Sequence, residues 1–136
     1  MKNELHEKVK EYFYIETGIF IESPEEMIYV CDFLLESKKY KVYFKNRIIK
    51  HFVERRKEDL MKRNSEIRSL EIILGMTEDL SVALVDYTKV ENNTKRLNSY
   101  LVYKNFSDPG KTPVTVVLES DEDRNMLIIS YYFTKR

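Results

Sequence analysis

The segment MLIISYYF, residues 126–133, is rich in β-branched and aromatic side chains, which favour an extended strand. The connectors upstream of this segment are short and rich in Asn, Asp, Ser, Pro and Gly, the residue types of tight turns. Consecutive strands joined by short turns predict a four-stranded antiparallel meander. The other three predicted strands are residues 82–90, 99–106 and 114–119.

The part of the chain before these strands has the apolar spacing of amphipathic helices. The sequence SPEE at residues 23–26 has the composition of a helix N-terminus, with a capping serine, a proline in the first turn and a glutamate that can close a capping box. Gly75 is expected to end the last helix, and residues 41–44 are expected to be extended. Helices followed by strands predict an α+β fold, with N-terminal helices packed on a C-terminal four-stranded antiparallel sheet. The predicted helices are residues 4–14, 23–36, 46–63 and 65–74.

The bulk composition predicts a single folded domain over residues 1–136. A chain of 136 residues is a usual size for one domain, and its hydrophobic fraction of 43% is enough for a core. The single cysteine, Cys31, excludes an intramolecular disulfide, and its apolar neighbours favour a buried side chain. We expect a cytoplasmic protein, because the N-terminus is charged and no apolar run approaches the roughly 20 residues that span a bilayer. No phosphate-binding glycine loop, dinucleotide fingerprint or zinc-ligand spacing is present, so we expect no cofactor and no metal.

A net charge of zero conceals a basic middle third of the chain. Residues 1–37 have a balance of −6, residues 38–70 a balance of +8 and residues 71–136 a balance of −2. A concentrated positive field attracts anions, and nucleic acid is the commonest large anion. The alternative is a solvated helix face that the acidic N-terminal helices neutralise.

The third predicted helix carries the clearest candidate site. Arg47, His51 and Arg55 are spaced by four residues, so they lie together on one flank of its apolar face. Histidine can exchange a proton near neutral pH, and arginine presents a fork of donors to phosphate oxygens. Cleavage of RNA without metal needs both residue types. Histidine is the base for the 2′-hydroxyl group, and arginine supplies positive charge that stabilises the phosphorane. The alternative is that His51 is an ordinary boundary residue and that Arg55 pairs with Glu58 or Asp59.

The last predicted strand supplies a candidate counterpart. With a strict period of two, one of its faces carries Ile128, Ser130, Tyr132 and Thr134. A row of hydroxyl groups can orient a phosphate, and aromatic rings on a sheet can stack on bases. The alternative is that this row is the solvent face of a half-covered sheet. The side chains predicted to bind nucleic acid are Arg47, Lys50, Arg56, Tyr132 and Lys135.

These features together resemble the barnase–EndoU–colicin–RelE group of small nucleases, and most closely the barnase-like domains of phage and mobile-element proteins. Two matching features are the short extended segment at residues 41–44 and the helix at residues 47–56 with its central histidine. Two more are the acidic strand start at residues 77–79 and the final strand around residues 128–132.

The resemblance covers about residues 40–136 and implies a helix-plus-sheet nuclease core. Residues 1–39 lie outside the resemblance and are expected to be a family-specific helical addition. The resemblance also implies RNA cleavage by a helix histidine with basic neighbours and a hydroxyl group on a late strand. The residues that the resemblance places at the site are His51, Arg55 and Ser130, and more weakly Arg56 and Tyr132.

Two classes of function therefore fit the sequence. The first is a metal-independent endoribonuclease, in which His51 transfers a proton and the arginines stabilise phosphate. The second is a non-catalytic phage or mobile-element protein that binds and inhibits a host protein or a nucleic-acid complex. It would use the basic helix on nucleic acid or the acidic N-terminal helices on a basic partner. A further alternative is homodimerisation through an exposed sheet face.

Overall fold

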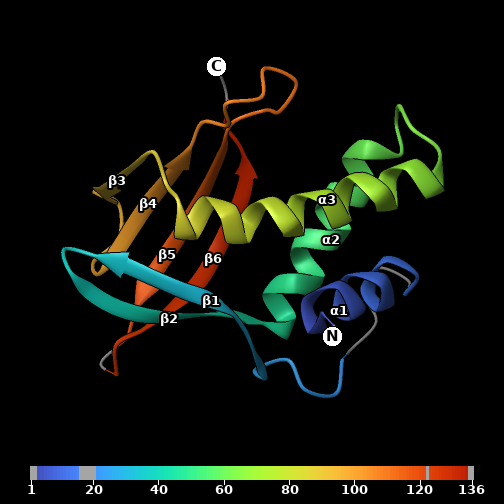
Figure 1. Cartoon of the computed structure of the whole chain (residues 1–136). Coiled ribbons are helices and arrows are strands. Elements are labelled where there is room, and N and C mark those ends of the chain that lie inside the picture. Colours follow the sequence, from blue (N-terminus) through green and yellow to red (C-terminus); the bar gives the residue numbers. More distant parts are fainter. Residues whose placement is uncertain (1–2, 16–20, 122, 135–136) are drawn as a thin grey trace.

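The structure is a computed structural model that describes residues 3–15, 21–121 and 123–134. Within these residues α3 lies across one face of a sheet, and α1 and α2 lie beside α3 (Figure 1). The helices are α1 (Glu4–Phe13), α2 (Asn46–Leu60) and α3 (Glu66–Val85). The strands are β1 (Met27–Leu35), β2 (Lys38–Lys45), β3 (Lys89–Asn92), β4 (Ser99–Lys104), β5 (Val114–Ser120) and β6 (Asn125–Phe133).

The described strands form one six-stranded mixed sheet, so the prediction of a four-stranded antiparallel meander is wrong. The strand order is β1-β2-β6-β5-β4-β3. β2 and β6 are parallel, and every other neighbouring pair is antiparallel. The meander prediction fails because it omits the β1–β2 hairpin and places the last strand at an edge of the sheet. β6 instead lies between β5 and β2.

β1 lies in the segment predicted as a helix over residues 23–36, and that prediction is also wrong. In β1, Ile28 and Phe33 are buried in the core. A bulge between Tyr29 and Cys31 shifts the alternation of the strand by one residue. Residues that face the core therefore have even numbers before the bulge and odd numbers after it. This irregular spacing resembles the spacing of apolar residues in an amphipathic helix.

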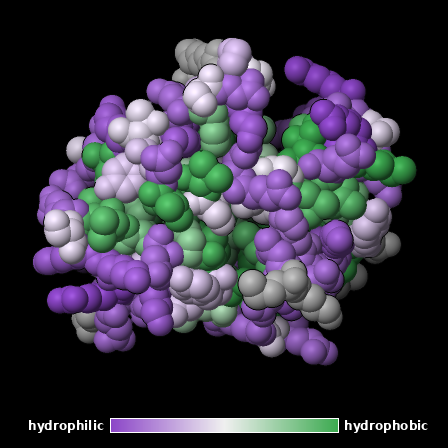
Figure 2. All heavy atoms as spheres, viewed as in Figure 1, coloured by the Kyte–Doolittle hydropathy of each residue, from purple (hydrophilic) through white to green (hydrophobic). Residues whose placement is uncertain are grey.

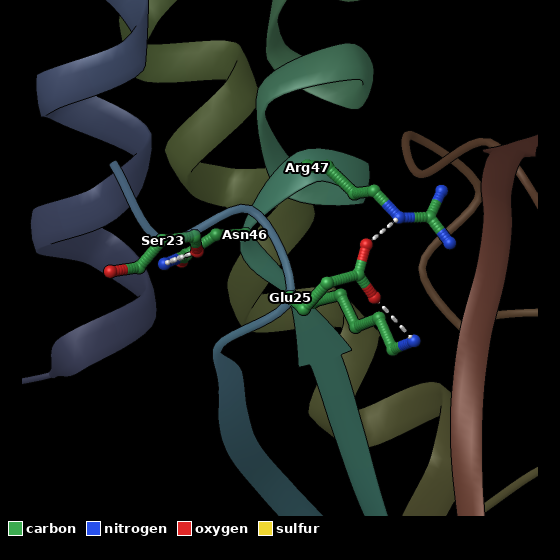
Figure 3. A network of polar contacts seen from close by, with 5 residues as sticks. Ser23, Glu25, Asn46 and Arg47 are labelled. Carbon is green, nitrogen blue, oxygen red and sulfur yellow. Dashed lines mark hydrogen bonds and ion pairs between the residues drawn. The ribbon is translucent and has the colours of Figure 1, made fainter. Parts of the chain in front are cut away.

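Residues 23–26, here called the strap, cap the N-terminal end of α2 instead of starting a helix of their own (Figure 3). The backbone N–H groups of Asn46 and Arg47 donate to strap carbonyl oxygens at 2.9 and 3.0 Å. The buried side-chain amide of Asn46 donates to the carbonyl oxygen of Ser23 at 3.0 Å. The first N–H groups of a helix need acceptors, and no side chain caps α2. The strap supplies these acceptors and fixes the position of this helix end.

α3 is longer than the helix predicted over residues 65–74. It continues through Gly75 to Val85, because its buried side chains keep the helical spacing along its whole length. An added Cβ at Gly75 would meet nothing within 4 Å, so glycine only weakens the helix there, by about 1 kcal/mol. The strand predicted over residues 82–90 is therefore wrong, since β3 begins only at Lys89.

The remaining elements agree with the sequence predictions. α1 and α2 lie within the helices predicted over residues 4–14 and 46–63, and β4, β5 and β6 overlap the last three predicted strands. α3 packs on β1, β4 and β5, while α2 packs on β2 and β6, so helices and sheet enclose one core. Its largest fully buried side chains include Phe13, Phe33, Phe44, Ile49, Leu80 and Ile128.

The surface seen in Figure 2 is largely hydrophilic, with hydrophobic residues in separate groups. On α3, Ile67 is exposed near one end of the helix and Val82 and Val85 near the other. None of the helices in the described residues is long and apolar enough to cross a membrane.

Candidate functional site

β2 and β6 run side by side over three residue pairs and then part. Residues 41–43 pair with residues 125–127. Beyond that point the chain turns from β2 into α2, and β6 continues with β5 on its other side only. The space that opens outside the carboxyl ends of parallel strands is a common place for a ligand. Here it is a cleft of about 280 Å³ between α2 and β6, the α2–β6 cleft. It is lined by Phe44, Ile48, His51, Phe52, Arg55, Arg56, Ile129, Ser130, Tyr131 and Tyr132.

A bulge at Ile129 decides which β6 side chains reach the mouth of this cleft. Ile128 and Ser130 pair with adjacent residues of β5, so Ile129 has no direct partner on that strand. Ile128 is buried before the bulge and Tyr131 is buried after it. The strict alternation that places Ile128 and Ser130 on one face is therefore wrong. Ser130 and Tyr132 are both exposed at the cleft, because a bulge redirects the side chains that follow it.

The floor of the cleft is aromatic. The rings of Phe52 and Tyr131 are stacked, with centroids 5.5 Å apart and an interplanar angle of 24°. The ring centroid of Phe44 lies 6.2 Å from that of Phe52. The Tyr131 hydroxyl donates to the carbonyl oxygen of Met76 at 2.6 Å. Burial raises the pKa of Tyr131 above its usual value of 10.0, so this hydroxyl stays protonated as a donor. Tyr131 therefore holds α3 and α2 in place and does not exchange protons with a ligand.

The rim of the cleft carries His51 and the two arginines. His51 and Arg55 are exposed, and Arg56 is half-buried. In the described part of the chain neither arginine forms an ion pair, so Arg55 does not pair with Glu58 or Asp59. The Nε atom of Arg56 is buried and has no hydrogen-bond partner among the described residues. The positive charge of both arginines is therefore available to a ligand.

Two other basic residues of α2 are engaged elsewhere. The Nε of Arg47 donates to a carboxylate oxygen of Glu25 in the strap at 2.8 Å (Figure 3). Lys50 pairs with Glu54 one turn along the helix, and both side chains are largely buried. Neither Arg47 nor Lys50 lines the α2–β6 cleft, although both are predicted to bind nucleic acid. Lys135, with the same prediction, lies outside the described residues.

The sequence predictions do not include the aromatic floor. The spacing of Phe44 and Phe52 indicates only that they are buried, and the bulge at Ile129 has no signal in the sequence. Spacing on the helix is the one signal that identifies part of the site, because it places a histidine and an arginine on one flank. The predicted site residues that the structure brings together at the α2–β6 cleft are His51, Arg55, Arg56, Ser130 and Tyr132.

A larger hollow, of about 710 Å³, lies on the other side of His51 and Arg55, against α1. Its lining includes the carboxylates of Glu54, Glu58 and Asp59. These three carboxylates outnumber the two cations of the described lining, Arg55 and Lys57, so this hollow is less favourable for a phosphate than the α2–β6 cleft. The α2–β6 cleft has no carboxylate in its described lining, and it is the better candidate for an anionic ligand.

No protein-family model, no curated protein and no solved structure matches this chain. The chemistry of the cleft is therefore inferred from its own residues. They offer one imidazole, two guanidinium groups, a serine hydroxyl and an exposed phenol. Such a set can donate several hydrogen bonds to a phosphate and can move one proton.

Proposed function

We propose that the α2–β6 cleft binds single-stranded RNA through its phosphodiester groups and that His51 transfers the proton in metal-independent cleavage. The observation that supports this proposal is that His51, Ser130, Arg55 and Arg56 meet in one cleft; among the described residues, no carboxylate lines this cleft or pairs with either arginine. Charge-assisted hydrogen bonds from guanidinium groups to phosphate are among the strongest that a protein forms. The volume of about 280 Å³ is close to the lower bound of small-ligand sites, roughly 300 Å³, and suits one nucleotide.

Each polar group of the cleft has a role in this proposal. Arg55 and Arg56 contact phosphate oxygens, and the Ser130 hydroxyl donates to the same group. Tyr132 is 37% exposed, so one face of its ring is open to a base. A base must leave its helical stack to reach such a ring, which favours a single strand over a duplex.

The proposed reaction needs one protein group for proton transfer. His51 accepts the proton of a ribose 2′-hydroxyl group while its oxygen attacks the neighbouring phosphorus. The bond from phosphorus to the 5′ oxygen breaks, leaving a 2′,3′-cyclic phosphate and a 5′-hydroxyl group. Water donates the proton to the departing oxygen, and the resulting hydroxide takes the proton held by His51. Arg55 and Arg56 stabilise the negative charge that develops on the phosphorane.

A cleavage assay in EDTA tests the catalytic part. General acid–base catalysis contributes about 10²–10⁴-fold, so His51→Ala should cleave labelled RNA at least about 100-fold more slowly than wild type. His6→Gln changes the only other histidine of the chain and is the matched control, with a rate close to wild type. Equal rates for wild type and His51→Ala, or no cleavage by either protein, would contradict the catalytic role.

Binding is measured separately with 2′-O-methyl RNA, which lacks the attacking hydroxyl group. Fluorescence anisotropy should show an affinity that falls as salt rises, because phosphate contacts displace bound counterions. His51→Ala should bind this RNA nearly as well as wild type, since the arginines remain. A wild-type protein that binds no RNA at low salt would contradict the proposed function as a whole.

The alternative of an acidic N-terminal region that binds a basic partner has less support. Glu25 is already bonded to Lys45 and Arg47, each at 2.8 Å. Asp32 forms an ion pair with Lys39 at 3.2 Å. Two acidic side chains of this region thus have partners within the chain, while the arginines of the cleft form no ion pair with any residue that the structure describes.

A further inference from the structure

A second hollow continues from the α2–β6 cleft toward the turn between α2 and α3. Its volume is about 470 Å³, and it shares Arg56 with the cleft. Phe133 lines this hollow and follows Tyr132 of the cleft along β6, so the two hollows lie along one strand. Lys62 and Arg63 add positive charge to its lining. We call it the basic hollow.

Lys62 and Arg63 are not needed to complete the end of α2. The last carbonyl oxygens of a helix lack partners within the helix and attract cations. Here the Leu60 carbonyl oxygen accepts from the backbone N–H groups of Arg63 and Asn64 at 3.1 and 2.9 Å, and from the Asn64 side chain at 3.0 Å. Lys62 and Arg63 are exposed and form no ion pair within residues 3–15, 21–121 and 123–134. Their charged groups are free for a ligand.

Arg56 lies where the two hollows meet. Its Nε atom is buried without an acceptor among the described residues, which is an unfavourable state for a charged donor. The Arg56 side chain lines both hollows, so its guanidinium group can donate to a phosphate oxygen in either one. The described lining of the basic hollow contains one carboxylate, that of Asp59, against the three cations Arg56, Lys62 and Arg63. The excess of positive charge therefore extends beyond the cleft itself.

We propose that the α2–β6 cleft and the basic hollow are neighbouring phosphate subsites of one track, so the protein selects an RNA strand of several nucleotides over a single nucleotide. This proposal rests on the proposed function of the cleft. An RNA strand carries one phosphate per linkage, and a strand along β6 places successive phosphates at Arg55, at Arg56 and at the Lys62–Arg63 pair. Each added phosphate contact raises both the affinity and its dependence on salt.

The test compares 2′-O-methyl RNAs of about three and about ten nucleotides by fluorescence anisotropy, at several salt concentrations. The subsite variant is Lys62→Glu with Arg63→Glu. The control variant is Lys38→Glu with Lys95→Glu, which has the same change in net charge. Lys38 begins β2 at the tip of the β1–β2 hairpin, far from the α2–α3 turn, and Lys95 is an exposed loop residue between β3 and β4 (Figure 1).

Wild type and the control variant should bind the longer RNA at least about tenfold more tightly than the shorter one. The subsite variant should keep its affinity for the shorter RNA and lose most of this advantage. All three proteins share the gain that comes merely from more binding registers on a longer strand, so the second subsite is measured by the difference in length advantage between the subsite variant and the control. Lys62→Ala with Arg63→Ala removes the charge without reversing it, and it serves if the glutamate variant does not fold.

Three results would overturn the proposal. If the subsite variant prefers the longer RNA as strongly as wild type does, or if the control variant loses as much of this preference, the basic hollow is not a second subsite. The proposed function of the cleft is unaffected by either result. A wild-type protein that binds neither RNA removes both proposals. A polyglutamate peptide of the same length that binds as tightly as the longer RNA shows selection for negative charge alone.

Discussion

The two halves of α2 hold their positive charges in different ways. In the N-terminal half, Arg47 bonds to the strap and Lys50 pairs with Glu54. In the C-terminal half, Arg55 and Arg56 face the α2–β6 cleft and form no ion pair in the described part of the chain. The anchors of the helix also differ along its length, because polar contacts hold its first turn and aromatic packing of Phe52 holds its middle.

This contrast shows that a count of basic residues does not locate an anion site. Residues 38–70 have a charge balance of +8, but several of their cations already have acidic partners. A paired cation must lose its partner before it can bind a phosphate, and an unpaired one need not. On α2 and the turn after it, the cations that line the cleft and the basic hollow, Arg55, Arg56, Lys62 and Arg63, form no ion pair with the residues that the structure describes.

The largest expected effect is on the stability of the aromatic anchor. Phe52→Ala should lower the free energy of unfolding by about 3–5 kcal/mol, because it leaves a cavity under Phe44 and Tyr131. Asn46→Ala, the matched change in the first turn of α2, removes the hydrogen bond to the Ser23 carbonyl oxygen and should cost about 1–2 kcal/mol. Urea unfolding measures both, and equal losses would show that the first turn and the middle of α2 are anchored equally strongly.

A smaller effect is expected on RNA binding. Arg55→Ala removes from the cleft a cation that has no ion-pair partner among the described residues, and it should weaken binding about tenfold, or about 1.4 kcal/mol. Arg47→Ala removes a cation that Glu25 already engages, and the change should stay within about twofold. Anisotropy with one RNA at one salt concentration compares the two variants. Equal weakening would mean that RNA senses the total charge of α2 and not the cleft.

The smallest effect is expected at the strap, as a dependence of stability on pH. Hydrogen bonds from Lys45 and Arg47 lower the pKa of Glu25 below its usual value of 4.5. A lowered pKa in the folded state stabilises the protein above pH 4.5, and this contribution is lost as pH falls through the lowered value. Glu25→Gln should therefore be slightly less stable than wild type at pH 7 and equally stable at about pH 2. Thermal unfolding at both pH values measures the difference, and a difference that grows in acid would contradict the pairing.

The helical half of the site could be predicted from the sequence, but the strand half could not be placed against it. A spacing of four residues puts His51 and Arg55 on one flank of any α-helix. The position of Ser130 and Tyr132 depends on the pairing of β6 with β2, whose residues lie more than 80 positions earlier in the chain. It also depends on the bulge at Ile129, which reverses the alternation that the sequence suggests.

The β1–β2 hairpin could not be predicted because the residues at its turn are not those that usually form such a turn. Its turn consists of Glu36 and Ser37, with φ values of 51° and 68°. Glycine or asparagine normally supplies such positive values, so the sequence carries no turn signal. The strap has the sequence of a helix N-terminus, and it does lie at the N-terminus of a helix. That helix is α2, which begins some 20 residues further along the chain.

Because β6 lies inside the sheet, the sheet and the α2–β6 cleft are completed in the same step of folding. Protein chains are synthesised from the N-terminus, so β1 and β2 emerge long before β6 and form a hairpin that is marginal on its own. The sheet becomes continuous only when β6 inserts between β2 and β5, a pairing between distant parts of the chain that forms slowly. The same insertion brings Ser130 and Tyr132 opposite His51. A nascent chain that lacks β6 therefore carries the basic helix without the cleft, and the cleft forms only once the whole sheet has been made.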